Sequence, residues 1–373
     1  HASNWPHESL DLKGKRVAVI GAGATAIQLI PEVAKEAKQL TVFQRRPNWA
    51  APLNNGPIST SEMTAIRERY NEIFATCAQT PGGFEHIPDS RSFYDVTPEQ
   101  RRELWDRLYD ESGFAIWLQN FMEIFTDESA NAEMSEYMAE RIRKRVNDPN
   151  IAELLIPKDH GFGVQRLPLE TGYFETFNRD NVSLVDVSDL GIECLTSAGL
   201  RAEGVDYDLD AIIYATGFDA MTGSVTRMKI VGADGQTIQQ KWEDGPATYI
   251  GLAISGFPNM FNMVSAGSPS VLATMVTCAE QHGDWVADCL VHMRDNGLTL
   301  IDATPEAEQS WVDEVNRASQ HSLRTRCDSW YVGSNVVGKA RVFAPYIGGW
   351  PPYVQKCKDV VANGYEGFTL ESL

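Results

Sequence analysis

The sequence lacks the residue patterns that mark several classes of protein. Its 373 residues contain no run of eighteen or more apolar residues, so no transmembrane helix is expected. Its six cysteines are scattered without a C-x-x-C pair, which predicts neither a disulfide framework nor a metal site. The seven histidines are equally dispersed. We therefore expect no structural metal, and a protein of the reducing cytoplasm.

Basic residues are also in short supply. Lys and Arg number 32 against 51 Asp and Glu, so the net charge is −19. This charge argues against nucleic acid or an anionic membrane as a partner, and it suits a soluble monomer or homodimer. Any anionic ligand must be held by a local cluster of Arg or Lys that works against the overall field.

The patterns that are present predict an α/β protein. The length favours two domains. An apolar, β-branched run at 16–20 predicts a strand, which is followed by a glycine-rich turn, a helix over 24–40 and a second strand over 40–44. Residues 59–156 carry helical periodicity and abundant charge, and we interpret them as a mostly helical insertion.

The second half of the chain returns to strand signals and then to helices. Strands are expected at 182–187 and 210–214, and helices at 272–296 and 305–321. The Gly- and Pro-rich tail that follows is expected to form loops and aromatic strands.

A glycine motif links the first strand to the first helix. The stretch from Gly21 to Ala26 fits G-x-G-x-x-A, in which Gly21 permits the tight turn and Gly23 lets the backbone approach a pyrophosphate. The small Ala26 allows the helix to pack closely on the strand, and the helix N-terminus faces the phosphates. The alternative is a turn with a purely structural role. We include Ala24, Thr25 and Gln28 among the expected cofactor-binding residues.

The end of the second strand indicates which dinucleotide binds. An NAD site has Asp or Glu there, about 20 residues after the motif, to bind the ribose 2′-hydroxyl. This chain has Arg45 and Arg46 instead, with no acid nearby. Two guanidiniums can bind a 2′-phosphate through charge-assisted hydrogen bonds, which favours NADP(H). The alternative is a solvated pair of arginines.

A short turn follows the strand expected at 210–214. Ala215, Thr216 and Gly217 would let the chain pass close to a dinucleotide. The tripeptide alone is more typical of an ordinary turn, and its significance comes from lying downstream of the glycine motif.

The N-terminal residues complete a resemblance to a known family. His1-x-x-x-Trp5-Pro6 resembles the second half of the F-x-G-x-x-x-H-x-x-x-W-P fingerprint of type I Baeyer–Villiger monooxygenases, which also precedes a G-x-G-x-x-A/G motif. In that family His1 and Trp5 match residues that act in cofactor handling and domain motion. Other similar stretches occur in family order along the whole chain: Val42–Trp49, Phe177–Val182, Tyr214–Ala220, Gly267–Ser270 and Gly364–Phe368.

The resemblance implies a flavin-dependent oxygenation. NADPH would reduce FAD, the reduced flavin would take up O2, and a peroxyflavin would attack a small-molecule ketone to give an ester or lactone. The family's catalytic Arg follows a Gly-rich stretch after the helical insertion, so Arg166 is the candidate, with a surface or salt-bridging Arg as the alternative. Gln165 stands where the family often has a Lys that helps to bind the 2′-phosphate.

The resemblance also suggests contacts in the C-terminal half. Trp330 matches a Trp that contacts the nicotinamide cofactor near the substrate, although a core aromatic is an equal alternative. Ser270, Val271 and Met275 match a loop and helix start that line the flavin and substrate pocket, although Met275 could equally fill a core.

The resemblance implies a Rossmann-like NADP-binding domain with a helical insertion, plus the C-terminal part of a Rossmann-like FAD domain. The expected ranges are 1–58 and 157–210 for the NADP-binding domain, 59–156 for the insertion, and 211–373 for the FAD-domain portion. No second G-x-G-x-x-G occurs, so we expect an N-terminal FAD-binding half, in the same or a separate chain. The alternatives are a related N- or S-oxidising flavin monooxygenase and a non-catalytic NADP-binding fragment.

Overall fold

The computed structural model describes residues 1–8 and 10–372, and the chain forms two compact units. Unit 1 consists of residues 1–56 and 89–218, and unit 2 consists of residues 57–88 and 219–373.

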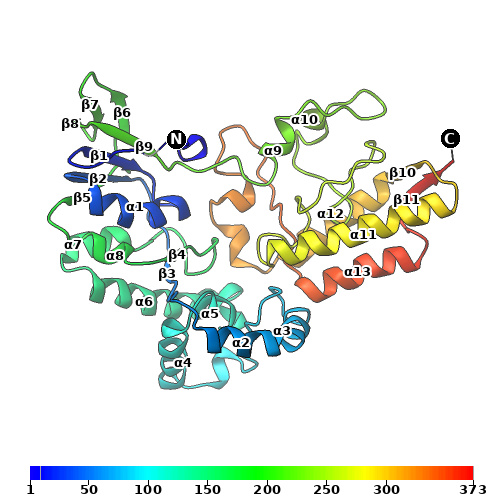
Figure 1. Cartoon of the computed structure of the whole chain (residues 1–373), viewed down its shortest axis with the longest axis horizontal. Coiled ribbons are helices and arrows are strands. Elements are labelled where there is room, and N and C mark those ends of the chain that lie inside the picture. The colour runs from blue at the N-terminus through cyan, green and yellow to red at the C-terminus, as the bar shows by residue number, and fades with distance from the viewer. Residues whose placement is uncertain (9, 373) are drawn as a thin grey trace. The chain divides into compact units, whose positions relative to one another are not determined.

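Unit 1 is built on a parallel sheet, and Figure 1 shows α1 (Ala24–Glu36) beside it. The strand order is β5-β2-β1-β9, which is 3-2-1-4 when these strands are counted along the chain. This is the order of a Rossmann dinucleotide-binding fold. The helix turns a buried stripe toward the sheet, which includes Ala26, Ile27 and Ile30. The strands are β1 Arg16–Ile20, β2 Gln39–Gln44, β5 Val182–Asp186 and β9 Ala211–Tyr214.

Helix α1 ends earlier than the pattern predicted. The expected helix over 24–40 stops at Glu36, because Ala37 is already extended. Lys38 then donates its backbone N–H to the carbonyl oxygen of Lys15 over 2.9 Å, so the pairing that leads into β2 begins here. Strand pairing has overridden a local sequence that favours a helix.

Strand β9 belongs to the sheet of unit 1. The sequence prediction assigned residues from 211 onward to a second domain. Instead, Ala211 pairs in parallel with Val17 of β1, and the boundary between the units follows Phe218. The Ala215–Gly217 turn therefore lies at the carboxyl edge of the same sheet as the glycine motif.

The expected helical insertion is divided between the two units. Residues 57–88 belong to unit 2 and the rest to unit 1. Backbone hydrogen bonds explain the division, since Gly82 accepts from Thr274 over 3.0 Å and Pro81 accepts from Trp350 over 2.9 Å.

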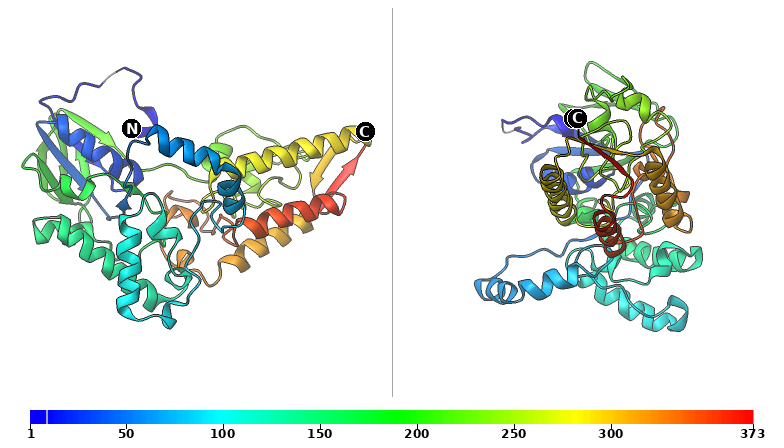
Figure 2. Two further views of the ribbon diagram at one scale, coloured as in Figure 1. Left: turned by 60° about the horizontal axis from the view of Figure 1, so that its bottom comes forward. Right: turned by 90° about the vertical axis from the view of Figure 1, so that its right-hand side faces the viewer.

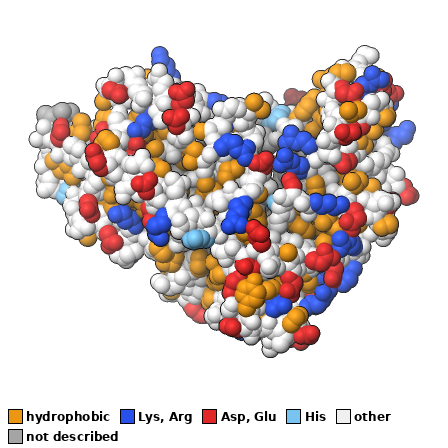
Figure 3. All heavy atoms as spheres, turned by 180° about the vertical axis from the view of Figure 1, so that it is seen from behind, with side chains coloured by type: hydrophobic (Ala, Val, Ile, Leu, Met, Phe, Trp, Pro, Cys, Tyr) orange, Lys and Arg blue, Asp and Glu red, His pale blue; other side chains and the backbone are white. Residues whose placement is uncertain are grey.

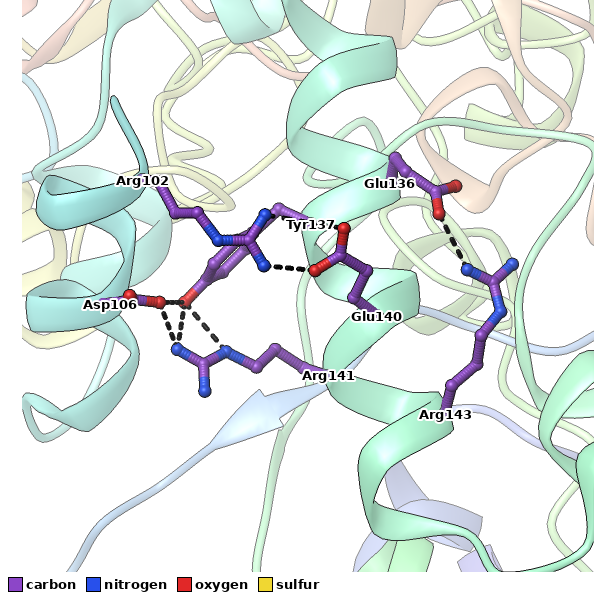
Figure 4. A network of polar contacts seen from close by, with 7 residues as sticks. All are labelled: Arg102, Asp106, Glu136, Tyr137, Glu140, Arg141 and Arg143. Carbon is purple, nitrogen blue, oxygen red and sulfur yellow. Dashed lines mark hydrogen bonds and ion pairs between the residues drawn. The ribbon is translucent and has the colours of Figure 1, made fainter. Parts of the chain in front are cut away.

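In unit 1, helices α4 (Pro98–Asp110) and α6 (Glu128–Arg145) are cross-linked by polar side chains, as Figure 4 shows. Tyr137 donates its hydroxyl to Asp106 over 2.8 Å, and Arg141 contacts both residues. Arg102 pairs with Glu140. These contacts stabilise the helical part of unit 1. Its other helices and a short parallel strand pair are α5 Ala115–Leu118, α7 Pro149–Leu155, α8 Tyr173–Thr176, β3 Ala51–Pro52 and β4 Leu169–Glu170.

An antiparallel meander, which the sequence analysis did not predict, packs on the parallel sheet. Its residues Leu200 and Ala202 join Ala18 and Phe43 in one buried cluster. Its strands are β6 Ile192–Leu195, β7 Gly199–Ala202 and β8 Val205–Asp208.

In the described part of unit 2, helices α11 (Met275–Asp295), α12 (Pro305–Ser319) and α13 (Trp350–Ala362) surround an apolar core that includes Trp285, Trp311 and Tyr353. Figures 1 and 2 show two of them, α11 and α13, side by side. The prediction of loops in the C-terminal tail was wrong for 350–362, which form α13. Unit 2 also contains the antiparallel strand pair β10–β11. The elements of unit 2 are α2 Thr60–Glu68, α3 Tyr70–Cys77, α9 Gly223–Thr226, α10 Ile238–Lys241, α11 Met275–Asp295, β10 Leu300–Ala303, α12 Pro305–Ser319, α13 Trp350–Ala362 and β11 Phe368–Glu371.

The surface carries both signs of charge. On the face drawn in Figure 3, Lys and Arg side chains are interspersed with Asp and Glu. Within 1–8 and 10–372, none of the helices is long and apolar enough to cross a membrane.

Candidate cofactor and active site

The glycine motif forms the tight turn that connects β1 to α1. Gly21 has φ +121°, and a Cβ at this position would overlap the carbonyl oxygen of Ala215. Gly23 begins the helix as its N-cap, with φ −82° and open space where a Cβ would lie. Gly21 is therefore required by the protein's own packing, whereas the open space at Gly23 is available to a ligand.

The start of α1 has the properties of an anion site. Its N-cap is Gly23, so no capping side chain accepts from the first backbone N–H groups, and its first turn contains no acidic residue. The N-terminus of a helix carries partial positive charge and directs backbone N–H groups outward. Ala24 and Gln28 are exposed, Thr25 is half-buried and Ala26 is buried against the sheet. This arrangement fits a pyrophosphate.

The predicted fingerprint residue His1 lies beside the Ala215–Gly217 turn. Its Nε2 is 3.4 Å from the hydroxyl of Thr216, and its ring packs edge-on against Phe218 at a centroid distance of 6.1 Å. The carboxyl ends of β1 and β9 therefore bring together His1, Gly21 and Thr216. Trp5 is 44% exposed.

The two arginines after β2 are both exposed. Arg46 Nη1 lies 3.6 Å from Asp159 Oδ2, whereas Arg45 makes no ion pair within the part of the chain that the structure describes. Both can therefore reach a ligand from the surface. They follow strand β2 directly, as the 2′-phosphate-binding residues of a Rossmann fold would.

Hydrogen bonds join the arginine segment to the loop that holds Arg166. Trp49 donates its indole N–H to the carbonyl of His160 over 3.0 Å, and Ala51 pairs with Leu169 in the two short strands. The structure thus brings the segments 44–52 and 157–170 side by side, although they are more than one hundred residues apart in sequence.

Arg166 lies against two aromatic rings. Its guanidinium carbon is 4.8 Å from the ring centroid of Phe114 and 5.2 Å from that of Trp117. Trp117 is fixed by an indole hydrogen bond of 3.2 Å to the carbonyl of Gly163, whose positive φ and contact with this indole leave no room for a side chain. Aromatic faces orient a cation without neutralising its charge. Gln165 and Arg166 are both half-buried.

The other predicted site residues lie in unit 2. Ser270 is buried, and Val271 packs in one cluster with Trp330 and Tyr331. Met275, the first residue of α11, is 61% exposed and so does not fill a core.

Trp330 lines a cavity of 340 Å³ whose walls also include Trp242, Asp219 and Lys339. Lys339 Nζ bonds both Asp219 Oδ1 and the carbonyl of Ala220 over 2.7 Å. The cavity is of the size that holds a small organic molecule.

The sequence analysis missed Asp159 and His160 as residues of this site. Asp159 Oδ1 lies 2.7 Å from His160 Nδ1, and burial lowers the pKa of that imidazole. They were visible in the sequence as an acid and an imidazole in the stretch before Arg166, but only the fold shows that this stretch reaches Arg46. Among residues 1–8 and 10–372, no group of three or more His, Cys, Asp or Glu could hold a metal ion.

Comparison with known proteins identifies the family. No family model matches the chain. It is 40% identical to the 2-oxo-Δ3-4,5,5-trimethylcyclopentenylacetyl-CoA monooxygenase of Pseudomonas putida, over 99% of this chain and 70% of the relative. It is 41% identical to the acetone monooxygenase (methyl acetate-forming) of Gordonia sp. (strain TY-5), with the same coverage. The crystal structure of OTEMO in complex with FAD and NADP (form 3) matches with a TM-score of 0.95 and 40% identity, over 99% of this chain and 70% of that one.

The conversion of acetone into methyl acetate places an oxygen atom beside a ketone carbonyl. The chain belongs to the flavin-dependent Baeyer–Villiger monooxygenases. The predicted family, fold class and enzyme class are confirmed, as are FAD and NADP(H) as the cofactors of this family. The roles of individual residues in this monooxygenase remain predictions.

Proposed function

We propose that unit 1 binds NADPH at the carboxyl edge of its parallel sheet. The N–H groups at the start of α1 would bind the pyrophosphate, and Gly23 would leave room for its approach. Arg45 and Arg46 would bind the 2′-phosphate and so discriminate against NADH. The loop that contains Gln165 lies beside the arginine segment, which supports a contact from Gln165 to the same cofactor.

We propose that Arg166 is the catalytic cation, and the observation that carries this assignment is its position on the faces of Phe114 and Trp117. When bound, FAD supplies the redox chemistry that activates O2. Negative charge then develops on oxygen as it adds to the ketone carbonyl, and a preoriented guanidinium stabilises that charge.

We propose that a second nucleotide-binding fold contributes to the flavin site. Residues 1–373 include one dinucleotide-binding glycine motif, at Gly21–Ala26, which we assign to NADPH. A second nucleotide-binding fold for FAD would come from an N-terminal half, in the same or a separate chain. Ser270, Val271 and Met275 would contact the flavin or substrate, and Trp330 would contact the nicotinamide cofactor.

The proposed substrates are a small-molecule ketone and O2, and the products are an ester or lactone. The relatives' names span acetone and a cyclopentenylacetyl-CoA, so they support a ketone as the substrate class without fixing its size. We place the enzyme in the cytoplasm, because its six cysteines are free thiols, which suits a reducing compartment.

Anaerobic reduction of the flavin-containing protein tests the cofactor assignment. NADPH is expected to bleach the flavin absorbance much faster than NADH. Arg45→Ala and Arg46→Ala should each remove about tenfold or more of that preference, the value of a charge-assisted hydrogen bond. Arg16→Ala is a matched control, because Arg16 starts β1 and pairs with Asp208 and Asp210 instead. Equal rates with both nucleotides in the unsubstituted protein would refute the assignment.

A further inference from the structure

Two β-branched residues of unit 2 have a left-handed backbone. Ile250 has φ +48° and Val264 has φ +56°. This conformation is strained for a residue with a branched Cβ, and it persists only where the surroundings impose it. Neither residue lies in a helix or a strand of the sheet. Something outside their own segments must therefore hold both in place.

One pair of buried side chains bonds to both strained residues. Val264 donates its backbone N–H to His282 Nδ1 over 3.0 Å, and Ile250 accepts the hydroxyl of Tyr353 over 2.7 Å. His282 Nε2 lies 2.5 Å from that same hydroxyl oxygen. His282 belongs to α11 and Tyr353 to α13, and both side chains are fully buried.

The directions of these hydrogen bonds are mutually consistent. Because Nδ1 of His282 accepts from Val264, the neutral ring carries its proton on Nε2 and donates it to Tyr353. Tyr353 can then donate its hydroxyl proton to the carbonyl oxygen of Ile250. The chain Val264–His282–Tyr353–Ile250 is therefore a fully satisfied network, which fixes one tautomer and one geometry.

Both strained residues are linked to the loop that leads to Ser270: Val264 is its first residue, and the segment around Ile250 contacts it. A Cβ on Gly251, next to Ile250, would lie 2.6 Å from the backbone nitrogen of Ser268. Thr248 donates its hydroxyl to the carbonyl of Ala266 over 2.9 Å. The turn at Ile250 thus packs against the loop, and the loop begins at Val264.

A catalytic role for the neighbouring thiol does not fit. Cys278 Sγ lies 3.6 Å from His282 Nε2, but burial raises the pKa of this thiol to about 12. The thiol therefore stays protonated and is a poor nucleophile.

We propose that His282 and Tyr353 are positioning residues for the monooxygenase reaction. By holding Ile250 and Val264 in strained conformations, they fix the loop over residues 264–271 where Ser270 and Val271 contact the flavin or the ketone. The expected effect on catalysis rests on the proposed function. The hydrogen-bond network that holds the two strained residues does not depend on that function.

The first experiment tests the network by thermal unfolding of the purified protein. His282→Gln can still reach Tyr353 but leaves the Val264 N–H without its acceptor, and is expected to lower Tm by about 4 °C or more. Val264→Gly removes the strain that the bond maintains. The loss of Tm caused by His282→Gln should therefore fall by at least half when Val264→Gly is also present. An identical loss in both backgrounds would overturn the proposal.

The second experiment measures how much ester is formed for each NADPH consumed. Tyr353→Phe should leave NADPH-driven flavin reduction within about twofold and lower the yield of ester about tenfold, because small displacements near reacting groups cost much of the rate. Adding Ile250→Gly should restore part of the yield. Tyr249→Phe is the matched control, since it removes a 2.8 Å hydroxyl bond to the Glu366 carbonyl in the same core.

The outcomes separate the two proposals. If Tyr353→Phe and Tyr249→Phe give the same ester yield, the positioning role is wrong even though the enzyme works as proposed. If the unsubstituted protein forms no ester, the proposed function fails. In that case the coupling between His282→Gln and Val264→Gly still decides whether the network holds the strained backbone.

Discussion

Arg46 Nη1 lies 3.6 Å from the carboxylate oxygen Oδ2 of Asp159, so one of the two predicted phosphate-binding arginines faces an acid of the protein itself. Both side chains are about half exposed, and such pairs contribute little to stability. A bound 2′-phosphate would compete with Asp159 for Arg46 and would be repelled by it.

Asp159→Asn is therefore expected to tighten NADPH binding. The gain should be about two- to fivefold in Kd, the scale of an exposed ion pair, with little change for NADH. Fluorescence titration with both nucleotides measures it. Asp208→Asn, which removes a comparable exposed partner of Arg16, is the control. Weaker NADPH binding in Asp159→Asn would show that this acid orients Arg46 instead of competing for it.

The two glycines of the motif should respond differently to the same substitution. Gly21→Ala places a Cβ against the carbonyl oxygen of Ala215 at a positive φ, which costs about 1–3 kcal/mol from the backbone conformation alone. Gly23→Ala meets open space at an ordinary φ, so the fold should be unaffected while NADPH binding weakens about tenfold or more. Thermal unfolding and NADPH titration distinguish them. A Gly23→Ala protein that binds NADPH normally would contradict the placement of the pyrophosphate.

Stability should depend on pH through His282. Burial lowers the pKa of its imidazole to about 4, whereas an unfolded His titrates near 6.5. Between these values the unfolded chain binds more protons, so this contribution is complete above pH 6.5 and is lost as the pH falls toward 4. The loss from pH 7 to pH 5 is about 2 kcal/mol. Cys278 and Tyr353, which face the ring, stay neutral because burial raises their pKa.

Urea unfolding at pH 7 and pH 5 checks this expectation. His282→Gln is less stable at pH 7 but should lose less stability between the two pH values, because glutamine does not titrate. His160, whose pKa is also lowered by burial, remains in both proteins and contributes equally. The same pH-dependent loss in the variant would rule out His282 as a source of the effect.

Local sequence patterns predicted the elements that depend on neighbouring residues. Strand β1 follows from a β-branched run and the start of α1 at Ala24 from a glycine turn. Helix α12 starts at Pro305, as predicted, and the structure shows Thr304 as its N-cap. The C-terminal helix α13 was missed because Pro351 and Pro352 suggested a loop. In the structure they occupy the first turn of the helix, where proline is well tolerated.

Contacts between segments that are distant in the sequence could not be predicted from local sequence patterns. Its position after the second strand identified Arg46 and the family resemblance identified Arg166, but only strand pairing brings their segments together. The same holds for His282 and Tyr353, which are 71 positions apart and meet through the packing of two helices. Resemblance supplied the family, whereas these contacts had to be observed.

The most direct test of the assigned chemistry is oxygen insertion by an Arg166→Ala protein. With NADPH, a ketone and ¹⁸O2, the unsubstituted FAD-containing enzyme is expected to form ester that carries one labelled atom. Arg166→Ala should reduce its flavin at a similar rate but form ester about a hundredfold more slowly, the usual loss when a charge-stabilising group is removed. Lys158→Ala, an exposed cation of the same loop, should retain activity. Labelled ester at an undiminished rate from Arg166→Ala would contradict the assignment of Arg166 as the catalytic cation.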